Sequence, residues 1–182
     1  MLEVVPFEAI SAEQRAAAAA ILVRAFAHAP AAWHSLEDAT AQVETFFDDE
    51  DRSALAAIDG GRLVGWIGLI RTYSHAFELH PIAVDPDRQR SGVGSILIRA
   101  LEDLARGQGA LCLYLGADDD FGGTSLFGAD PFPDLLASLA ATEARGERRP
   151  IGFYRKLGFT LAGLIPDANG LGKPDILLAK RL

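Results

Sequence analysis

The feature that most constrains the fold of this chain is a strand, turn, helix and strand that follow one another in its middle. Residues 77–84 read as a strand, and Asp85-Pro86-Asp87 ends it because proline cannot continue a hydrogen-bonded ladder. Apolar side chains then recur on one helical face from Val93 to Leu104, before two glycines. Residues 110–115 are almost wholly apolar, as expected of a central strand covered on both sides.

The flanking segments predict further elements of the same sheet. Ser11 and Gln14 form a capping box at the start of a first helix, and a second helix is expected from Ser35 to about Asp48. Further strands are expected at 2–6, 54–58, 63–70, 159–164 and 175–179, and helices at 134–144 and 151–157. The order predicts one α/β or α+β domain over residues 1–182, with a long loop and helix insertion at about 117–149.

Composition and charge exclude several classes of function. The chain has 25 acidic and 17 basic residues, so it suits cationic ligands and not nucleic acid. Its longest apolar run, residues 16–23, is too short to span a membrane, and Glu3 and Glu8 are atypical of a secretory signal. We therefore expect a cytoplasmic protein without a membrane partner. The single Cys112 excludes a disulfide framework or a cysteine-built zinc site, and we expect it to be a buried small hydrophobe.

The turn Gln89-Arg90-Ser91-Gly92-Val93-Gly94 carries the clearest chemical signal. A helix start offers unpaired N–H groups and a positive dipole end, and glycines let a phosphate approach them. Arg88 and Arg90 place mobile cations beside the same spot. Neither the P-loop motif nor the dinucleotide fingerprint fits, and the alternative is a helix start that merely tolerates glycines. Strand, turn, arginines and amphipathic helix together favour pyrophosphate binding.

The segments around this turn resemble the GNAT superfamily of acetyltransferases, and within it the chromosomal-type aminoglycoside 6′-N-acetyltransferases. The matching stretches are the coenzyme A signature at 89–94, Glu-Leu-His-Pro at 78–81, Leu-Gly-Ala-Asp-Asp at 115–119, Phe-Tyr-Arg-Lys-Leu-Gly-Phe at 153–159, Ile-Pro-Asp-Ala-Asn-Gly at 165–170 and Lys-Pro-Asp at 173–175. The resemblance covers roughly residues 60–180, whereas residues 1–55 match only in general layout. It implies a mixed, mostly antiparallel central sheet flanked by helices, with a splay between two central strands, and a homodimer to which loop 117–149 contributes.

The resemblance also implies acetyl-CoA as co-substrate. Pro81 lacks an N–H, so within an internal strand it belongs at a bulge, although it could instead shield a sheet edge. In the family, the pantetheine arm pairs with the bulged strand and one freed N–H polarises the thioester carbonyl. The expected coenzyme-binding residues are Ile82, Ala83, Val84, Gln89, Arg90, Ser91, Gly92, Val93, Gly94 and Ser95.

Three residues are predicted to be catalytic. Glu78 and His80 are two apart on a strand and share a face, so either could take the proton of an ammonium substrate directly or through water. Glu78 is the better candidate for holding the substrate's cation and His80 for the base, and ordinary packed or solvated roles are the alternatives. Tyr154 matches a tyrosine that the superfamily often places near the coenzyme sulfur, where a phenol could donate to the leaving thiolate. The alternative is that the aromatic ring of Tyr154 only anchors its helix to the sheet.

An acidic run is the predicted acceptor site. Asp118, Asp119 and Asp120 follow the central strand and suit a polyamine-like ligand, as the family resemblance also implies, although charge runs are usually solvated turns. A metal site is discounted because no D-x-D-x-D-G loop is present. Tyr73 and Trp33 are further candidates for the wall of the acceptor pocket, and Tyr73 completes the substrate-binding set, although an ordinary core role would suit either residue.

The sequence therefore predicts acetyl transfer from acetyl-CoA to a small cationic amine. The resemblance specifies the 6′-amine of an aminoglycoside, an antibiotic-resistance activity, by direct attack in a ternary complex, since no activated nucleophile is apparent. One alternative is a polyamine, peptide or small-metabolite amine as the acceptor. Another is a coenzyme A-binding domain without turnover.

Overall fold

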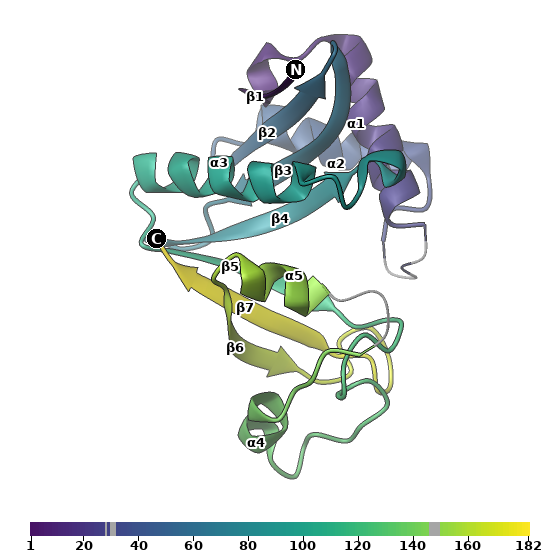
Figure 1. Ribbon diagram of the computed structural model, residues 1–182, viewed down its shortest axis with the longest axis vertical. Coiled ribbons are helices and arrows are strands. Elements are labelled where there is room, and N and C mark those ends of the chain that lie inside the picture. Colours follow the sequence, from purple (N-terminus) through teal and green to yellow (C-terminus); the bar gives the residue numbers. More distant parts are fainter. Residues whose placement is uncertain (28, 30–31, 146–149) are drawn as a thin grey trace. The chain divides into compact units, whose positions relative to one another are not determined.

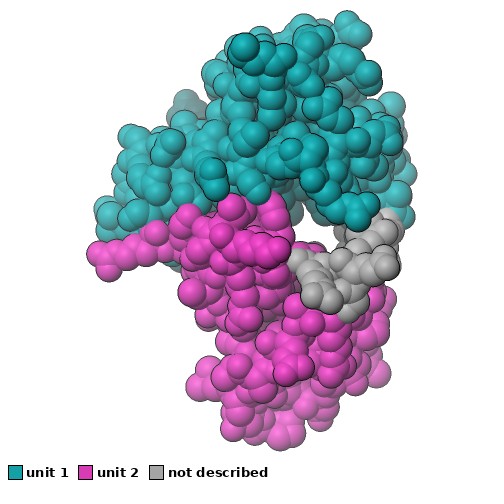
Figure 2. All heavy atoms as spheres, in the orientation of Figure 1, with its two compact units in different colours: residues 1–113, 182 teal, residues 114–181 magenta. Residues whose placement is uncertain are grey.

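The computed structural model describes residues 1–27, 29, 32–145 and 150–182, so residues 146–149 of the predicted insertion lie outside the described residues (Figure 1). The chain divides into two compact units, residues 1–113 with 182 (unit 1) and residues 114–181 (unit 2), as Figure 2 shows. The prediction that residues 1–182 form a single domain stays a prediction. No helix in the described ranges has the length and apolar character needed to cross a membrane.

In its described residues, unit 1 is built on four antiparallel strands and three α-helices. Its elements are β1 (Leu2–Pro6), η1 (Phe7–Ala9), α1 (Ala12–Ala25), α2 (Leu36–Asp48), β2 (Arg52–Asp59), β3 (Arg62–Ile70), β4 (Ala76–Val84), η2 (Pro86–Arg88) and α3 (Val93–Gly107). The strands are hydrogen-bonded in the order β1-β2-β3-β4. The predicted capping box is confirmed, because Ser11 and Gln14 each accept a hydrogen bond from the other's backbone N–H.

Helices cover both faces of the unit 1 sheet. On one face α1 and α2 pack over a core centred on Trp66, which is fully buried and donates its indole N–H to the Ala18 carbonyl of α1 at 3.1 Å. The Phe7 ring lies 5.1 Å from Trp66 in the same core. Helix α3 packs against the sheet with its buried side chains, among them Leu97, Ile98 and Leu101. Helices therefore pack on the sheet on both sides of β4, which leads into the turn that opens α3.

The bulge predicted at Pro81 is present. Between the pairs Ile67–Ile82 and Leu69–Leu79, β3 contributes one residue, Gly68, and β4 contributes two, His80 and Pro81. The extra residue shifts the alternation of side chains along β4.

The shift decides which side chains of β4 share a face. In the β3–β4 ladder, Glu78 pairs with Ile70, and Ala83 pairs with Trp66. Trp66 and Ala83 belong to the core under α1 and α2, and Ile70 packs against it. Glu78 and Ala83 therefore face the same way although five positions separate them. A regular strand would place them on opposite faces.

Unit 2 contains β5 (Cys112–Asp118, beginning in unit 1), α4 (Leu135–Ala140), α5 (Pro150–Lys156), β6 (Thr160–Ile165) and β7 (Asp175–Arg181). The strand order is β5-β7-β6, with β6 and β7 antiparallel. Strands and helices together confirm the predicted fold class, a mixed α/β fold with a mostly antiparallel sheet. The splay between two central strands stays a prediction.

Three local predictions in this part of the chain were wrong. Strand β5 runs to Asp118 and alternates between buried and more exposed residues, so it is not covered on both sides as predicted. Cys112 is accordingly half-buried. A short apolar run cannot reveal whether one face or two faces of a strand are covered. Helix α4 is shorter than the predicted 134–144: Asp134 caps its start, the helix ends at Ala140, and Ala144 forms an isolated antiparallel β-bridge with Thr124.

We predict that Gly68→Ala destabilises the protein by about 1–3 kcal/mol. A Cβ at this position would collide with the His80 carbonyl oxygen and lie 2.5 Å from the Phe46 ring, so the bulge or the core must shift. Gly107→Ala is the control, since a Cβ there meets nothing within 4 Å. Urea unfolding followed by circular dichroism measures both variants, and equal stabilities would contradict the explanation.

Candidate active site

The predicted coenzyme turn opens α3 with its backbone donors exposed. Gly92 is the N-cap residue with φ 93° and provides no side-chain cap, and Arg90 has φ 60°. In the part of the chain that the structure describes, the N–H groups of residues 90–95 donate to no protein acceptor. A cluster of such donors at a helix start is suited to an anion. The residues present therefore fit the diphosphate of a coenzyme.

The two arginines of the turn differ in their surroundings. Arg88 donates to the Asp59 carboxylate at 2.7 Å, and this hydrogen bond lowers the pKa of Asp59. Arg88 is thus held by the end of β2 and is not the mobile cation predicted beside the diphosphate. Arg90 is exposed within the turn itself, so it is the better placed of the two to meet a ligand's negative charge.

Glu78 and His80 lie on the α1 and α2 side of β4, as the bulge requires. His80 is exposed, and its ring centroid is 5.8 Å from that of Trp33, which packs edge-to-face on Phe26. The sequence could not show that Trp33 lies beside His80, because nothing in the pattern around an aromatic residue in a loop indicates which distant residue it contacts. These side chains form one polar and aromatic surface of unit 1.

Tyr73 does not have the core role considered for it. It lies in the connection 71–75 between β3 and β4 and its residue surface is 66% exposed. Its backbone N–H donates to the Ala76 carbonyl at 3.2 Å, which tightens the connection. Tyr73 therefore lies at the surface of unit 1 and not in its core.

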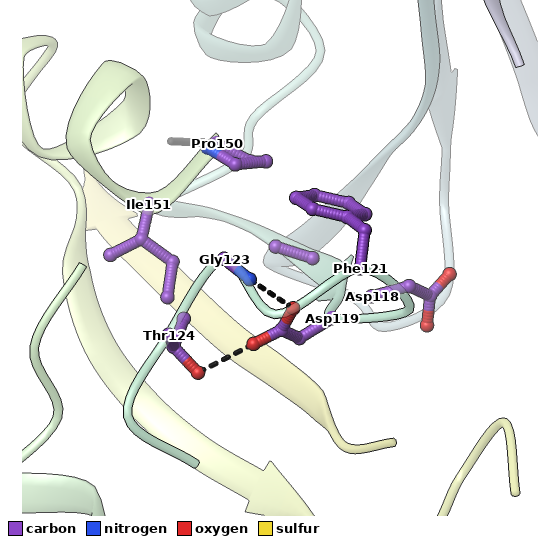
Figure 3. A pocket seen from close by; sticks show the side chains of 8 residues that line it. Asp118, Asp119, Phe121, Gly123, Thr124, Pro150 and Ile151 are labelled. Carbon is purple, nitrogen blue, oxygen red and sulfur yellow. Dashed lines mark hydrogen bonds between the residues drawn. The ribbon is translucent and has the colours of Figure 1, made fainter. Parts of the chain in front are cut away.

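The three consecutive aspartates of unit 2 have separate environments. Asp119 is 2% exposed, and its carboxylate accepts hydrogen bonds from the Gly123 N–H and the Thr124 hydroxyl, each at 2.6 Å (Figure 3). Asp118 is exposed at the end of β5 and accepts from the Asn169 side chain, whereas Asp120 is half-buried. This arrangement favours a structural role for Asp119 and leaves Asp118 as the more accessible carboxylate.

Tyr154 lies on α5 in an aromatic cluster of unit 2. Its ring packs edge-to-face with Phe153 and Phe159, at centroid distances of 5.2 and 5.8 Å. Burial raises the pKa of the phenol because the phenolate would be poorly solvated. The side chain therefore stays protonated at neutral pH, which is the form that a proton donor requires.

The predicted site residues thus fall into two groups. Unit 1 holds Tyr73, Glu78, His80, residues 82–84 and the turn 89–95, and unit 2 holds Tyr154 and residues 118–120. Within each group the residues come from neighbouring elements.

A family model described as "Acetyltransferase (GNAT) family" matches residues 19–124, more than half of the chain. The chain therefore belongs to the GNAT acetyltransferase family, and we describe it as a GNAT acetyltransferase.

Two solved structures are similar to nearly the whole chain. One is an aminoglycoside 6′-N-acetyltransferase complexed with coenzyme A, 30% identical over 98% of this chain and 96% of that one, with a TM-score of 0.88. The other is the aminoglycoside 6′-N-acetyltransferase from Enterococcus faecium, also 30% identical over the same shares, with a TM-score of 0.87.

A curated relative matches a shorter stretch. N-alpha-acetyltransferase RimI of Mycobacterium tuberculosis (strain ATCC 25618 / H37Rv) is 42% identical over 69 residues, which cover 36% of this chain and 43% of that relative. The chain thus matches less than half the length of this relative.

The hydrogen bonds of Asp119 predict that Asp119→Ala lowers the free energy of unfolding by about 1–3 kcal/mol, because a buried N–H and a buried hydroxyl lose their acceptor. Asp118→Ala, next to it and exposed, should cost about 1 kcal/mol or less. Thermal unfolding by circular dichroism distinguishes the two variants. If Asp119→Ala proves as stable as Asp118→Ala, the structural role assigned to Asp119 is wrong.

Proposed function

We propose that this GNAT acetyltransferase moves the acetyl group of acetyl-CoA to the 6′-amine of an aminoglycoside, an activity that would confer antibiotic resistance. The single observation that carries the proposal is the exposed, left-handed turn at Arg90 and Gly92, whose N–H groups meet no acceptor among the described residues. Its likeness over 98% of the chain to two aminoglycoside 6′-N-acetyltransferases supports the choice of acceptor.

In this proposal the turn binds the coenzyme through its diphosphate. The N–H groups at Gly92, Val93, Gly94 and Ser95 donate to phosphate oxygens, with Gln89, Arg90 and Ser91 around them. The pantetheine arm pairs with the backbone of Ile82, Ala83 and Val84 beyond the bulge, and one N–H there polarises the thioester carbonyl.

The acceptor's amine needs a base and the departing thiolate needs an acid. Glu78 holds the cationic substrate, and His80, directly or through water, takes the proton that the ammonium must lose before it attacks. The amine nitrogen then bonds to the thioester carbonyl carbon, the carbon–sulfur bond breaks, and the Tyr154 phenol donates its proton to the thiolate. The nitrogen loses its second proton as the amide forms, and this proton, carried by water, restores the phenol. Tyr73, Asp118 and Asp120 contact the acceptor's other polar groups, whereas Asp119 braces the loop.

The proposal includes a cytoplasmic homodimer in which residues 1–182 act as one domain. Loop 117–149 contributes to the contact between copies. Exposed apolar side chains in this loop support such a contact, since Phe132 is 62% and Leu136 80% exposed.

A second candidate acceptor is the α-amine of a peptide. The RimI match favours it, because that relative is named an N-alpha-acetyltransferase and is 42% identical over its 69 matched residues. The coenzyme chemistry is the same for either acceptor.

We predict that a 6′-amino aminoglycoside releases coenzyme thiol from acetyl-CoA, while a matched aminoglycoside with a 6′-hydroxyl does not, because only an amine at this position can attack. The same thiol assay is run with spermidine and with a peptide bearing a free N-terminus. Turnover of the peptide or spermidine alone would contradict the aminoglycoside assignment. Coenzyme binding in calorimetry without thiol release from any amine would support a domain without turnover.

Two variants test the catalytic roles. His80→Ala and Tyr154→Phe should each lower kcat by about tenfold or more, since each removes a proton-transfer group. Neither should change the Kd for coenzyme A by more than about twofold, because neither residue belongs to the coenzyme turn. A variant with normal kcat would remove its residue from the mechanism.

A further inference from the structure

Arg24 joins the last turn of α1 to the segment that leads into the coenzyme turn. Its guanidinium lies 3.2 Å from the Asp85 carboxylate and 2.9 Å from the Asp87 carboxylate. Asp85 is 8% exposed, whereas the Asp87 side chain is 82% exposed. One planar cation thus holds two carboxylates on either side of Pro86, a geometry that a guanidinium suits and an ammonium does not.

The carboxylate that Arg24 meets also shapes the backbone of η2. Asp85 accepts a hydrogen bond from the Asp87 N–H at 3.1 Å, and its carbonyl accepts from the Arg88 N–H at 2.7 Å. The Asp85 N–H donates to the Val64 carbonyl of β3 at 2.9 Å. Asp85 is therefore the residue where β3, η2 and α1 are fastened together.

The fastening continues into the coenzyme turn. The Arg88 carbonyl accepts a hydrogen bond from the Ser91 hydroxyl at 2.5 Å, and Gln89 reaches back to the Val84 carbonyl at 3.3 Å. The Arg88 side chain is held by Asp59. A continuous series of contacts thus links the Arg24 guanidinium to the Asp85 carboxylate, the Asp85 carbonyl to the Arg88 N–H, and the Arg88 carbonyl to the Ser91 hydroxyl next to Gly92.

We propose that Arg24 is a positioning residue for the coenzyme turn: by fixing Asp85 and Asp87 it holds the N–H groups of residues 90–95 in the arrangement that receives the diphosphate. The inference rests on the proposed coenzyme role of that turn. A donor pattern that binds an anion must be held in place before binding, because ordering a loose turn would reduce affinity. The two terminal nitrogens of the Arg24 guanidinium are already paired with the Asp85 and Asp87 carboxylates, so in this proposal Arg24 acts through those carboxylates and not by contact with the coenzyme.

The test compares acetyl-CoA with acetyl-pantetheine, a thioester with the same acyl arm and no diphosphate, as donors to one 6′-amino aminoglycoside. For Arg24→Met we expect kcat/KM with acetyl-CoA to fall roughly three- to tenfold, mainly through KM, because a charge-assisted pair is lost at a partly exposed site. With acetyl-pantetheine kcat/KM should change by less than about twofold, because this donor does not use the turn. Calorimetry should report the same loss in the Kd for coenzyme A.

Matched variants separate positioning from general stability. Arg15→Met, on the same helix but paired with Glu44 of α2, should leave both donors unaffected. Arg24→Lys should recover part of the acetyl-CoA loss, since an ammonium can satisfy one carboxylate. An equal loss with both donors, or no loss with acetyl-CoA, overturns the proposal.

Gly92→Val distinguishes failure of the inference from failure of the proposed function, because it distorts the turn directly. If this variant discriminates between the donors and Arg24→Met does not, the Arg24 proposal alone is wrong. If Gly92→Val binds coenzyme A like the wild type, or the wild type binds none, the turn is not the coenzyme site and both proposals fail.

Discussion

The bulge in β4 is the constraint on which the arrangement of unit 1 depends. A proline inside a paired strand removes one ladder donor, and the strand accommodates it by setting two residues, His80 and Pro81, against Gly68. The shifted alternation sends Glu78 to the side that α1 and α2 cover and returns Ala83 to the same side. One strand thus presents polar side chains before the bulge and an apolar anchor after it, without leaving the sheet.

The charges of unit 1 are distributed so that this strand leads into a basic turn of an acidic protein. The chain carries a formal charge of −8, yet Asp59, Asp85 and Asp87 are each paired with an arginine close to the turn. Pairing neutralises the carboxylates that would otherwise repel an anionic ligand. Arg90 remains exposed in the turn, so it adds a positive charge at a place where the neighbouring carboxylates are already paired.

Local chemistry explains what could be predicted from the sequence. The capping box at Ser11, the bulge at Pro81 and the start of α3 follow from the conformational rules of one or a few adjacent residues. Several of the errors and omissions involve partners far apart in the chain: Arg88 pairs with Asp59 at a separation of 29 residues, and Arg24 with Asp85 at 61. The same holds for Trp33 beside His80. The sequence shows that Asp119 is charged, but not that the Gly123 N–H and the Thr124 hydroxyl donate to its carboxylate. It likewise shows that β5 is apolar, but not which of its faces is covered.

Tyr73 shows how such a scaffold could change its acceptor without changing its architecture. It lies on the short connection 71–75, where its backbone N–H donates to the Ala76 carbonyl, and its residue surface is exposed. Replacing or lengthening this connection would change the surface that precedes Glu78 in the chain. The strands, the bulge in β4 and the ion pair of Asp85 with Arg24 would stay as they are. Substitutions in this connection could therefore change the range of acceptors at little cost in stability. A substitution at Gly68 would be costly, because its Cβ would collide with the Phe46 ring.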